Sequence, residues 1–146
     1  MLMNNKLLTI ILTLCLALPS LGLYAQNKYE PVVGNDKNGN NIYAEAPDRM
    51  PEFKGGVDGL GIYLSQNTVY PKKALKVHAE GKAVVEFIIN EKGKVVNPTI
   101  KTSAGHEALD AEAIRVIRKM PRWKPGTKDG KPVKVKYYIP VNFALH

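Results

Sequence analysis

The alternation of apolar and polar residues predicts three β-strands in the second half of the chain. They cover Lys82–Asn90, Lys94–Thr102 and Val133–Phe143. The first two are separated by the turn Asn90-Glu91-Lys92-Gly93, so we expect them to form an antiparallel hairpin. The apolar faces of the three strands are expected to hold Ala83, Val85, Phe87, Ile89, Val96, Ile100, Val133, Val135, Tyr137, Ile139, Val141 and Phe143.

A helical period follows the hairpin, over roughly Glu107–Lys119. Its apolar stripe matches one face of a sheet, so the fold class is α+β: a small antiparallel sheet with a ββαβ core, packed against helices. Weaker helical signals precede the hairpin at Gly55–Asn67 and Pro71–Ala79. The polar stretch before them, Asn27–Asp48, reads as either a hairpin turning at Asn38-Gly39 or a loose arm.

Two prolines predict the order of the strands. Proline cannot donate a hydrogen bond to a sheet ladder, so a strand that contains one belongs at an edge. Pro98 therefore places Lys94–Thr102 at one edge, and Pro140 places the last strand at the other. The strand Lys82–Asn90 lies between them, which gives the order 2-1-3. The last strand is then expected to leave one edge open.

That open edge is the candidate site for a partner. If Pro140 faces outward, Lys134, Lys136 and Tyr138 also present their backbone N–H and C=O groups outward, and a visiting strand could pair with them. The alternative is that lysine and proline protect the edge from aggregation. Both interpretations fit the pattern.

The N-terminal segment 1–25 has the layout of a secretory signal peptide, with cleavage expected after Ala25. An uncleaved anchor is the alternative, but its apolar run is only just long enough to span a membrane. Cys15 is the single cysteine, so the exported part excludes disulfides and thiolate chemistry.

The net charge of +8 is concentrated at the C-terminal end, where residues 115–146 hold nine lysines and arginines against Asp129 alone. We expect a basic patch there, which could steer acidic partners or be an ordinary solvated face. Its candidate residues are Arg118, Arg122, Lys124 and Lys128.

Catalytic chemistry has no support in the sequence. His78, His106 and His146 are not at metal-binding spacing, and no nucleophile motif or phosphate loop occurs. We therefore expect neither an enzyme nor a bound cofactor or metal, and the strict alternation of the last strand argues against nucleic-acid stacking.

Several short motifs occur in order along the chain, and together they resemble the C-terminal domain of TonB energy transducers, most closely the Bacteroidetes-type versions. The resemblance covers about Met50 to Phe143. Its motifs are Met50-Pro-Glu-Phe-Lys-Gly-Gly56, Tyr70-Pro71, Gly81-Lys82, Glu91-Lys-Gly93, Leu109-Asp110, Met120-Pro-Arg-Trp-Lys-Pro-Gly126, Gly130-Lys131-Pro132-Val133 and Pro140-Val-Asn-Phe143.

This resemblance implies a periplasmic module for proton-motive-force-coupled transport across the outer membrane, without a cofactor. It would bind the N-terminal box of TonB-dependent outer-membrane transporters as an added strand. The partner-binding residues so implied are Asn67, Thr68, Val133, Lys134, Val135, Lys136, Tyr137, Tyr138 and Ile139. Trp123 corresponds to a core tryptophan of the family.

One departure from the family concerns the tether. Only about 25 residues separate Ala25 from Met50, at most about 80 Å when extended, without a proline-rich spacer. Two interpretations follow: an anchored transducer that also meets an inner-membrane proton-channel complex, or a stand-alone periplasmic module. The second could instead hold its basic face to an anionic envelope polymer or lipid. The sequence leaves open whether the module forms a homodimer through its free edges.

Overall fold

The structure is a computed structural model that describes residues 29–35, 41–43 and 47–146. The expected signal segment lies outside these residues. The strands are β1 (Tyr29–Asn35), β2 (Asn41–Tyr43), β3 (Gly81–Ile89), β4 (Val95–Thr102), β5 (Gly126–Lys128) and β6 (Lys131–Phe143), and the helices are α2 (Gly56–Asn67), α3 (Lys72–Lys76) and α4 (Glu107–Arg118).

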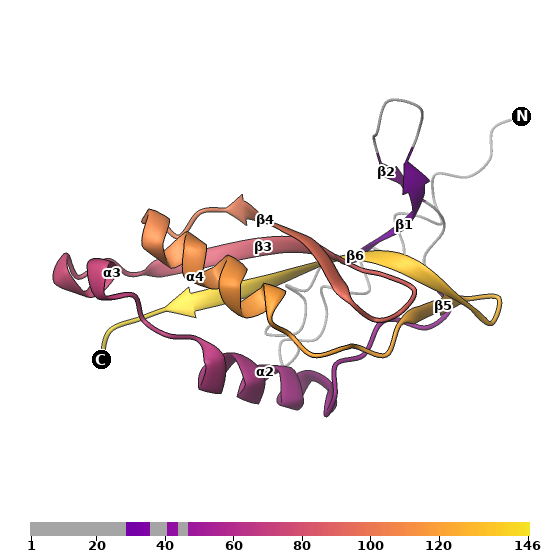
Figure 1. The fold of residues 1–146 in the computed structure, drawn as a ribbon, viewed down its shortest axis with the longest axis horizontal. Helices are drawn as coiled ribbons and strands as arrows, with labels where there is room; N and C mark the ends of the chain where they lie inside the picture. Colours follow the sequence, from indigo (N-terminus) through magenta and orange to yellow (C-terminus); the bar gives the residue numbers. More distant parts are fainter. Residues whose placement is uncertain (1–28, 36–40, 44–46) are drawn as a thin grey trace, which may run out of the picture.

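The strands form an antiparallel sheet in the order β2-β1-β6-β3-β4 (Figure 1). Within it, β4-β3-β6 is the expected order of the ββαβ core, so the α+β prediction is confirmed. The strand that contains Pro98, β4, lies at an edge as predicted. The polar N-terminal stretch contributes the hairpin β1–β2 rather than a loose arm.

The expectation of an open edge on the last strand is wrong over part of its length. Strand β1 pairs antiparallel with β6, from Tyr29 opposite Tyr137 to Val32 opposite Lys134. The physical reason is that unpaired backbone groups of β6 are a template for any nearby extended segment, and the N-terminal hairpin supplies one. No described strand pairs with this side of β6 beyond Tyr137.

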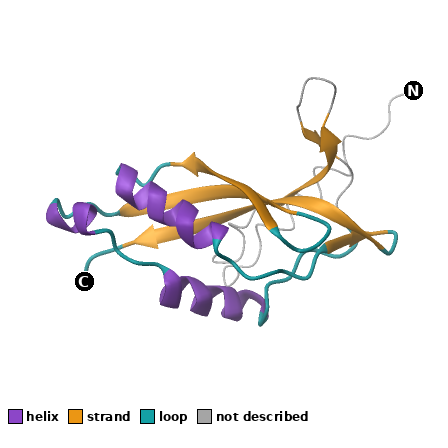
Figure 2. Cartoon of the chain, viewed as in Figure 1, coloured by secondary structure: helices purple, strands orange, loops and turns teal. Residues whose placement is uncertain are grey.

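The hydrophobic core lies between the sheet and the helices. Figure 2 shows the helices along one side of the sheet, and the β1–β2 hairpin extends away from the edge of the sheet beside β6. Helix α4 packs against β3 and β4, and the Tyr63 hydroxyl of α2 donates a hydrogen bond of 3.0 Å to the Val116 carbonyl of α4. The largest fully buried side chains are Phe87, Ile89, Leu109, Ile117, Ile139, Val85, Val116 and Val135.

Strand β4 departs from simple alternation, so one predicted core residue is wrong. Val95 is buried, whereas Val96 is only half-buried. Asn97 has a φ of 52°, and the β3–β4 register shifts between Glu86 and Ile88. The bulge inserts an extra residue into β4, which changes the face that the neighbouring side chains occupy.

The remaining differences from the sequence prediction are small. Helix α3 is shorter than predicted, with Pro71 just outside it as the N-cap residue. Strand β5 was not predicted; it forms a hairpin with β6 through Asp129 and Gly130, which both have positive φ.

Candidate functional site

The outward-facing backbone groups of β6 follow from its pairing with β3. That pairing runs without a shift from Val135 to Phe143 and sets Pro140 opposite Val84. Because proline has no N–H to give to the ladder, its nitrogen faces away from β3. Backbone groups alternate along a strand, so every second residue faces the same way as Pro140. We call this row the outer edge of β6; its other members are Lys134, Lys136, Tyr138 and Asn142.

Strand β1 agrees with this assignment. Its residues Glu30 and Val32 lie opposite Lys136 and Lys134, two members of the outer edge of β6. Pro31 lies opposite Val135, which faces β3, so Pro31 occupies the position in β1 where no donor toward β6 is needed. Pro140 in β6 and Pro31 in β1 therefore agree on which β6 residues direct their backbone groups toward β1.

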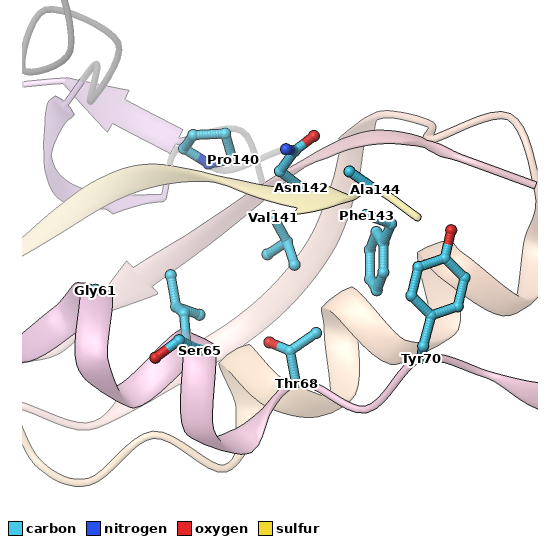
Figure 3. Close-up of a pocket in the computed structure, with 10 residues that line it drawn as sticks. Gly61, Ser65, Thr68, Tyr70, Pro140, Val141, Asn142, Phe143 and Ala144 are labelled. Atoms are coloured by element: carbon cyan, nitrogen blue, oxygen red, sulfur yellow. The ribbon is translucent and has the colours of Figure 1, made fainter. Parts of the chain in front are cut away.

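A groove lies beside the C-terminal end of β6. Residues Pro140–Ala144 form one wall, and the other consists of α2 and the segment that follows it (Figure 3). The groove has a volume of about 430 Å³. The hydroxyl oxygen of Thr68 is buried in this region and has no hydrogen-bond partner among the described residues. Buried hydroxyls normally have partners, so a hydrogen bond from a guest that reaches this oxygen would satisfy it.

An ion pair on α4 fixes the wall that contains Thr68. Glu112, which is only 9% exposed, accepts a hydrogen bond of 2.7 Å from the backbone N–H of Val69. Arg115 donates to both oxygens of Glu112, at 2.6 and 2.7 Å, and also to the Asn67 carbonyl at 2.7 Å. Asn67 and Val69 are thus held on either side of Thr68.

The same contacts determine the ionisation of Glu112. Burial alone would raise the pKa of Glu112, but hydrogen bonds from Arg115 and from the Val69 backbone outweigh burial and hold the pKa below its ordinary value. The hydrogen bond to Glu112 also raises the pKa of Arg115. Both groups are therefore charged at neutral pH. We call this ion pair, with its hydrogen bonds to the backbone of Asn67 and Val69, the clamp of Glu112 and Arg115; it is intact at neutral pH.

Comparison with known proteins shows the family to which this chain belongs. Residues 66–145, more than half of the chain, match the family model described as Gram-negative bacterial TonB protein C-terminal. The chain belongs to the TonB C-terminal family. Protein TonB of Vibrio cholerae is 35% identical to it over 78 residues, which are 52% of this chain and 31% of that protein. This chain thus matches about a third of the length of that relative.

Two solved structures of the Helicobacter pylori TonB C-terminal domain are also similar. The one that spans residues 194–285 is 25% identical with a TM-score of 0.45, and it covers 60% of this chain and 91% of that one. The one that spans residues 179–285 is 26% identical with a TM-score of 0.44, covering 60% and 78%. TonB proteins are not enzymes, so family membership confirms the corresponding expectation from the sequence.

The candidate residues of this TonB domain lie on two elements, β6 and the end of α2. The predicted partner-binding strand, residues 133–139, is the middle of β6, and Asn67 and Thr68 end α2 beside the groove. On the core side of β6, Val135 and Ile139 are almost fully buried, so any contact there would be made by backbone. An added strand would pair with the backbone groups of the outer edge of β6.

Two side chains on the face of β6 opposite the core are less exposed than their polarity suggests. Lys136 is 5% exposed and lies 3.6 Å from the Glu86 carboxylate of β3, and Tyr138 is 7% exposed. Lys134 is half-buried. The face of β6 opposite the core is thus partly buried. The alternation of apolar and polar residues alone predicts a solvated face there.

The predicted basic patch of the TonB domain divides into two parts. Arg118, Arg122 and Lys124 are exposed at the end of α4 and in the loop after it. Lys128 instead pairs with Asp48 at 3.2 Å. Asp48 also accepts a hydrogen bond from the Asp129 backbone, and this bond and Lys128 lower the pKa of Asp48. The exposed basic patch therefore contains three of the four residues predicted from the sequence.

Trp123 has the packing role that the resemblance implied. It is 4% exposed, and its ring centroid lies 5.2 Å from that of Phe53, 5.3 Å from that of Tyr137 and 6.2 Å from that of Phe87. Burial raises the pKa of Tyr137. The aromatic cluster lies directly beneath the part of β6 that pairs with β1.

Sequence reasoning missed the clamp of Glu112 and Arg115. A spacing of three residues is common among ion pairs on helix surfaces, so the sequence gives no sign that Glu112 is buried on α4. Within the part of the chain that the structure describes, no cluster of potential metal ligands occurs and no helix is both long and apolar enough to cross a membrane.

Proposed function

We propose that this chain is a periplasmic TonB-like protein whose domain binds the N-terminal box of TonB-dependent outer-membrane transporters by strand addition at the outer edge of β6. Through this contact it takes part in transport across the outer membrane. The observation that carries the proposal is the pairing of β1 with β6, because it indicates that the edge accepts an extended strand through backbone groups. Family membership supports this class of partner.

The groove supports the same proposal. A guest that follows β6 toward Phe143 would pass the buried Thr68 hydroxyl, which could pair with a backbone group of the guest. The clamp of Glu112 and Arg115 holds that hydroxyl in place before the guest arrives. A preformed wall lowers the entropic cost of binding.

No feature of the described residues favours the alternative, a basic face that binds an anionic polymer or lipid. Within the patch, Lys128 lies near the Asp48 carboxylate, which reduces the net positive field of the patch. High salt distinguishes the two functions, because polyanion binding weakens steeply with salt whereas backbone pairing does not.

The test uses substitutions of Thr68 and synthetic peptides from the N-termini of transporters of the same bacterium. Thr68→Val removes the buried hydroxyl at nearly constant shape, so the free energy of unfolding should stay the same or rise. Peptide affinity, measured by calorimetry, should fall about fivefold or more. Thr68→Ser keeps the hydroxyl and should keep most of the affinity.

Amide exchange of the complex locates the bound peptide. New protection should appear along β6 and near residues 67–68. Peptide binding that leaves these amides unchanged, or that disappears at 0.5 M salt, would overturn strand addition at this edge.

A further inference from the structure

The N-terminal strand β1 occupies the edge that the proposed function assigns to the transporter. We propose that β1 is an internal competitor, which closes the Lys134–Tyr137 part of the outer edge until an incoming strand displaces it. This inference rests on the proposed function and adds its regulation. A backbone edge pairs with one strand at a time, so β1 and a guest cannot occupy these residues together.

The geometry suggests where a guest begins. Tyr29, the first residue of β1, lies opposite Tyr137, and no described strand pairs with the outer edge of β6 between Tyr137 and Phe143. The groove lined by Thr68 and by Pro140–Ala144 lies at this end of β6. A guest can therefore make its first contacts there while β1 is still in place, and then extend toward Lys134 as β1 leaves.

The short pairing of β1 fits a strand that can be displaced. Because backbone groups alternate along a strand, only Glu30 and Val32 direct theirs toward β6, opposite Lys136 and Lys134. Its four paired positions contrast with the nine that join β3 to β6. Loss of β1 therefore removes little of the sheet, and the ββαβ core remains paired.

The occupant is this chain's own strand rather than that of a second copy. The same β1 strand continues from its pairing with β6 into its pairing with β2, so one hairpin reaches the edge directly. Exchange of β1 between two copies is the alternative arrangement. It predicts protection of the edge that depends on protein concentration.

Two opposed variants of the full chain test the competition, both in a Cys15→Ser background. In the released variant, Glu30→Pro with Val32→Pro removes both donors that face β6, and Glu30→Ala with Val32→Ala is its matched control. In the locked variant, Val32→Cys with Lys134→Cys joins the strands at paired positions, whose expected Cα separation of about 5.5 Å suits a disulfide. Reduction of the locked variant provides its own control.

The readouts are amide exchange at Lys134 and Lys136, and the affinity for the transporter peptides. In free wild-type protein both amides should be protected, and in the released variant they should exchange quickly. The released variant should bind peptide about tenfold more tightly than its alanine control, because no fraction of the protein is closed. The oxidised locked variant should lose most of the affinity and regain it on reduction.

The outcomes separate the two claims. Equal peptide affinity in the released, locked and control variants would overturn the competition and leave the proposed function in place. Unprotected amides at Lys134 and Lys136 in the free protein would also overturn it. Failure of even the released variant to bind peptide would overturn the proposed function itself. Protection that rises with protein concentration would assign β1 to a second copy.

Discussion

At the scale of single residues, the most constrained positions are those where the backbone of one element touches that of another. Gly93, in the β3–β4 turn, has a φ of 77°, and its carbonyl accepts a hydrogen bond of 2.8 Å from the Trp123 backbone. A Cβ at Gly93 would collide with the Trp123 carbonyl oxygen. Gly130, in the β5–β6 turn, has a similar φ of 75° but open space around it.

This contrast gives a stability prediction. Gly130→Ala should lower the free energy of unfolding by about 1 kcal/mol, the cost of a positive φ alone. Gly93→Ala should lower it by about 3 kcal/mol or more, because the turn must also move away from Trp123. Urea denaturation followed by circular dichroism measures both, and equal losses would contradict the close approach.

Glu112 makes a prediction about pH. Its pKa is lower in the folded protein than in the unfolded chain, so its contribution to stability is present above the unfolded value of about 4.3 and is lost as pH falls through the folded value. Glu112→Gln should reduce the free energy of unfolding by about 1–3 kcal/mol at pH 7. The difference from wild type should shrink below pH 4; a constant difference in urea titrations would argue against the ion pair as its source.

At the scale of elements, the prolines and the alternating pattern predicted the order of the ββαβ core, but the placement of β6 at an edge of the sheet from Pro140 is wrong, because β1 pairs with β6. Pro98 correctly placed β4 at an edge, and the periodicity located α2 and α4 to within one or two residues. The bulge at Asn97 was not predictable from alternation, since a positive φ at one asparagine leaves no periodic signal.

The site was predictable only in part, because it depends on how elements far apart in the sequence pair. Pro140 indicates which way the backbone of β6 faces, but not whether another segment pairs with it. A three-residue strand such as β2 and the proline in β1 give weak signals on their own. The pairing of β1 depends on long-range contact, which no local pattern encodes.

The C-terminal end of β6, where none of the described strands pairs with the outer edge, allows the edge to be tested without disturbing β1. Asn142 is exposed and faces outward, so Asn142→Pro removes an outward N–H and leaves the pairing with β3 intact. Asn142→Ala changes the side chain only. We expect Asn142→Pro to weaken peptide binding about tenfold and Asn142→Ala to have little effect in the same calorimetric titration. Equal affinities would place the guest short of this residue.

At the scale of the whole molecule, charge is distributed unevenly, and the exposed excess lies at Arg118, Arg122 and Lys124. Reversing these three residues to glutamate should slow association with an acidic peptide severalfold at about 20 mM salt, because steering acts on the encounter. The effect should vanish near 0.5 M salt, where the Debye length is only a few ångströms. Stopped-flow rates check this; an unchanged low-salt rate would exclude steering.

The single tryptophan of the chain gives the edge an optical reporter. Tyr137 points its ring into the cluster around Trp123, while its own backbone position lies opposite β1. A shift of β6 that accompanies the exchange of one strand for another would therefore alter the surroundings of the indole. Emission from Trp123 should report in real time which polypeptide lies on the outer edge, without any attached dye.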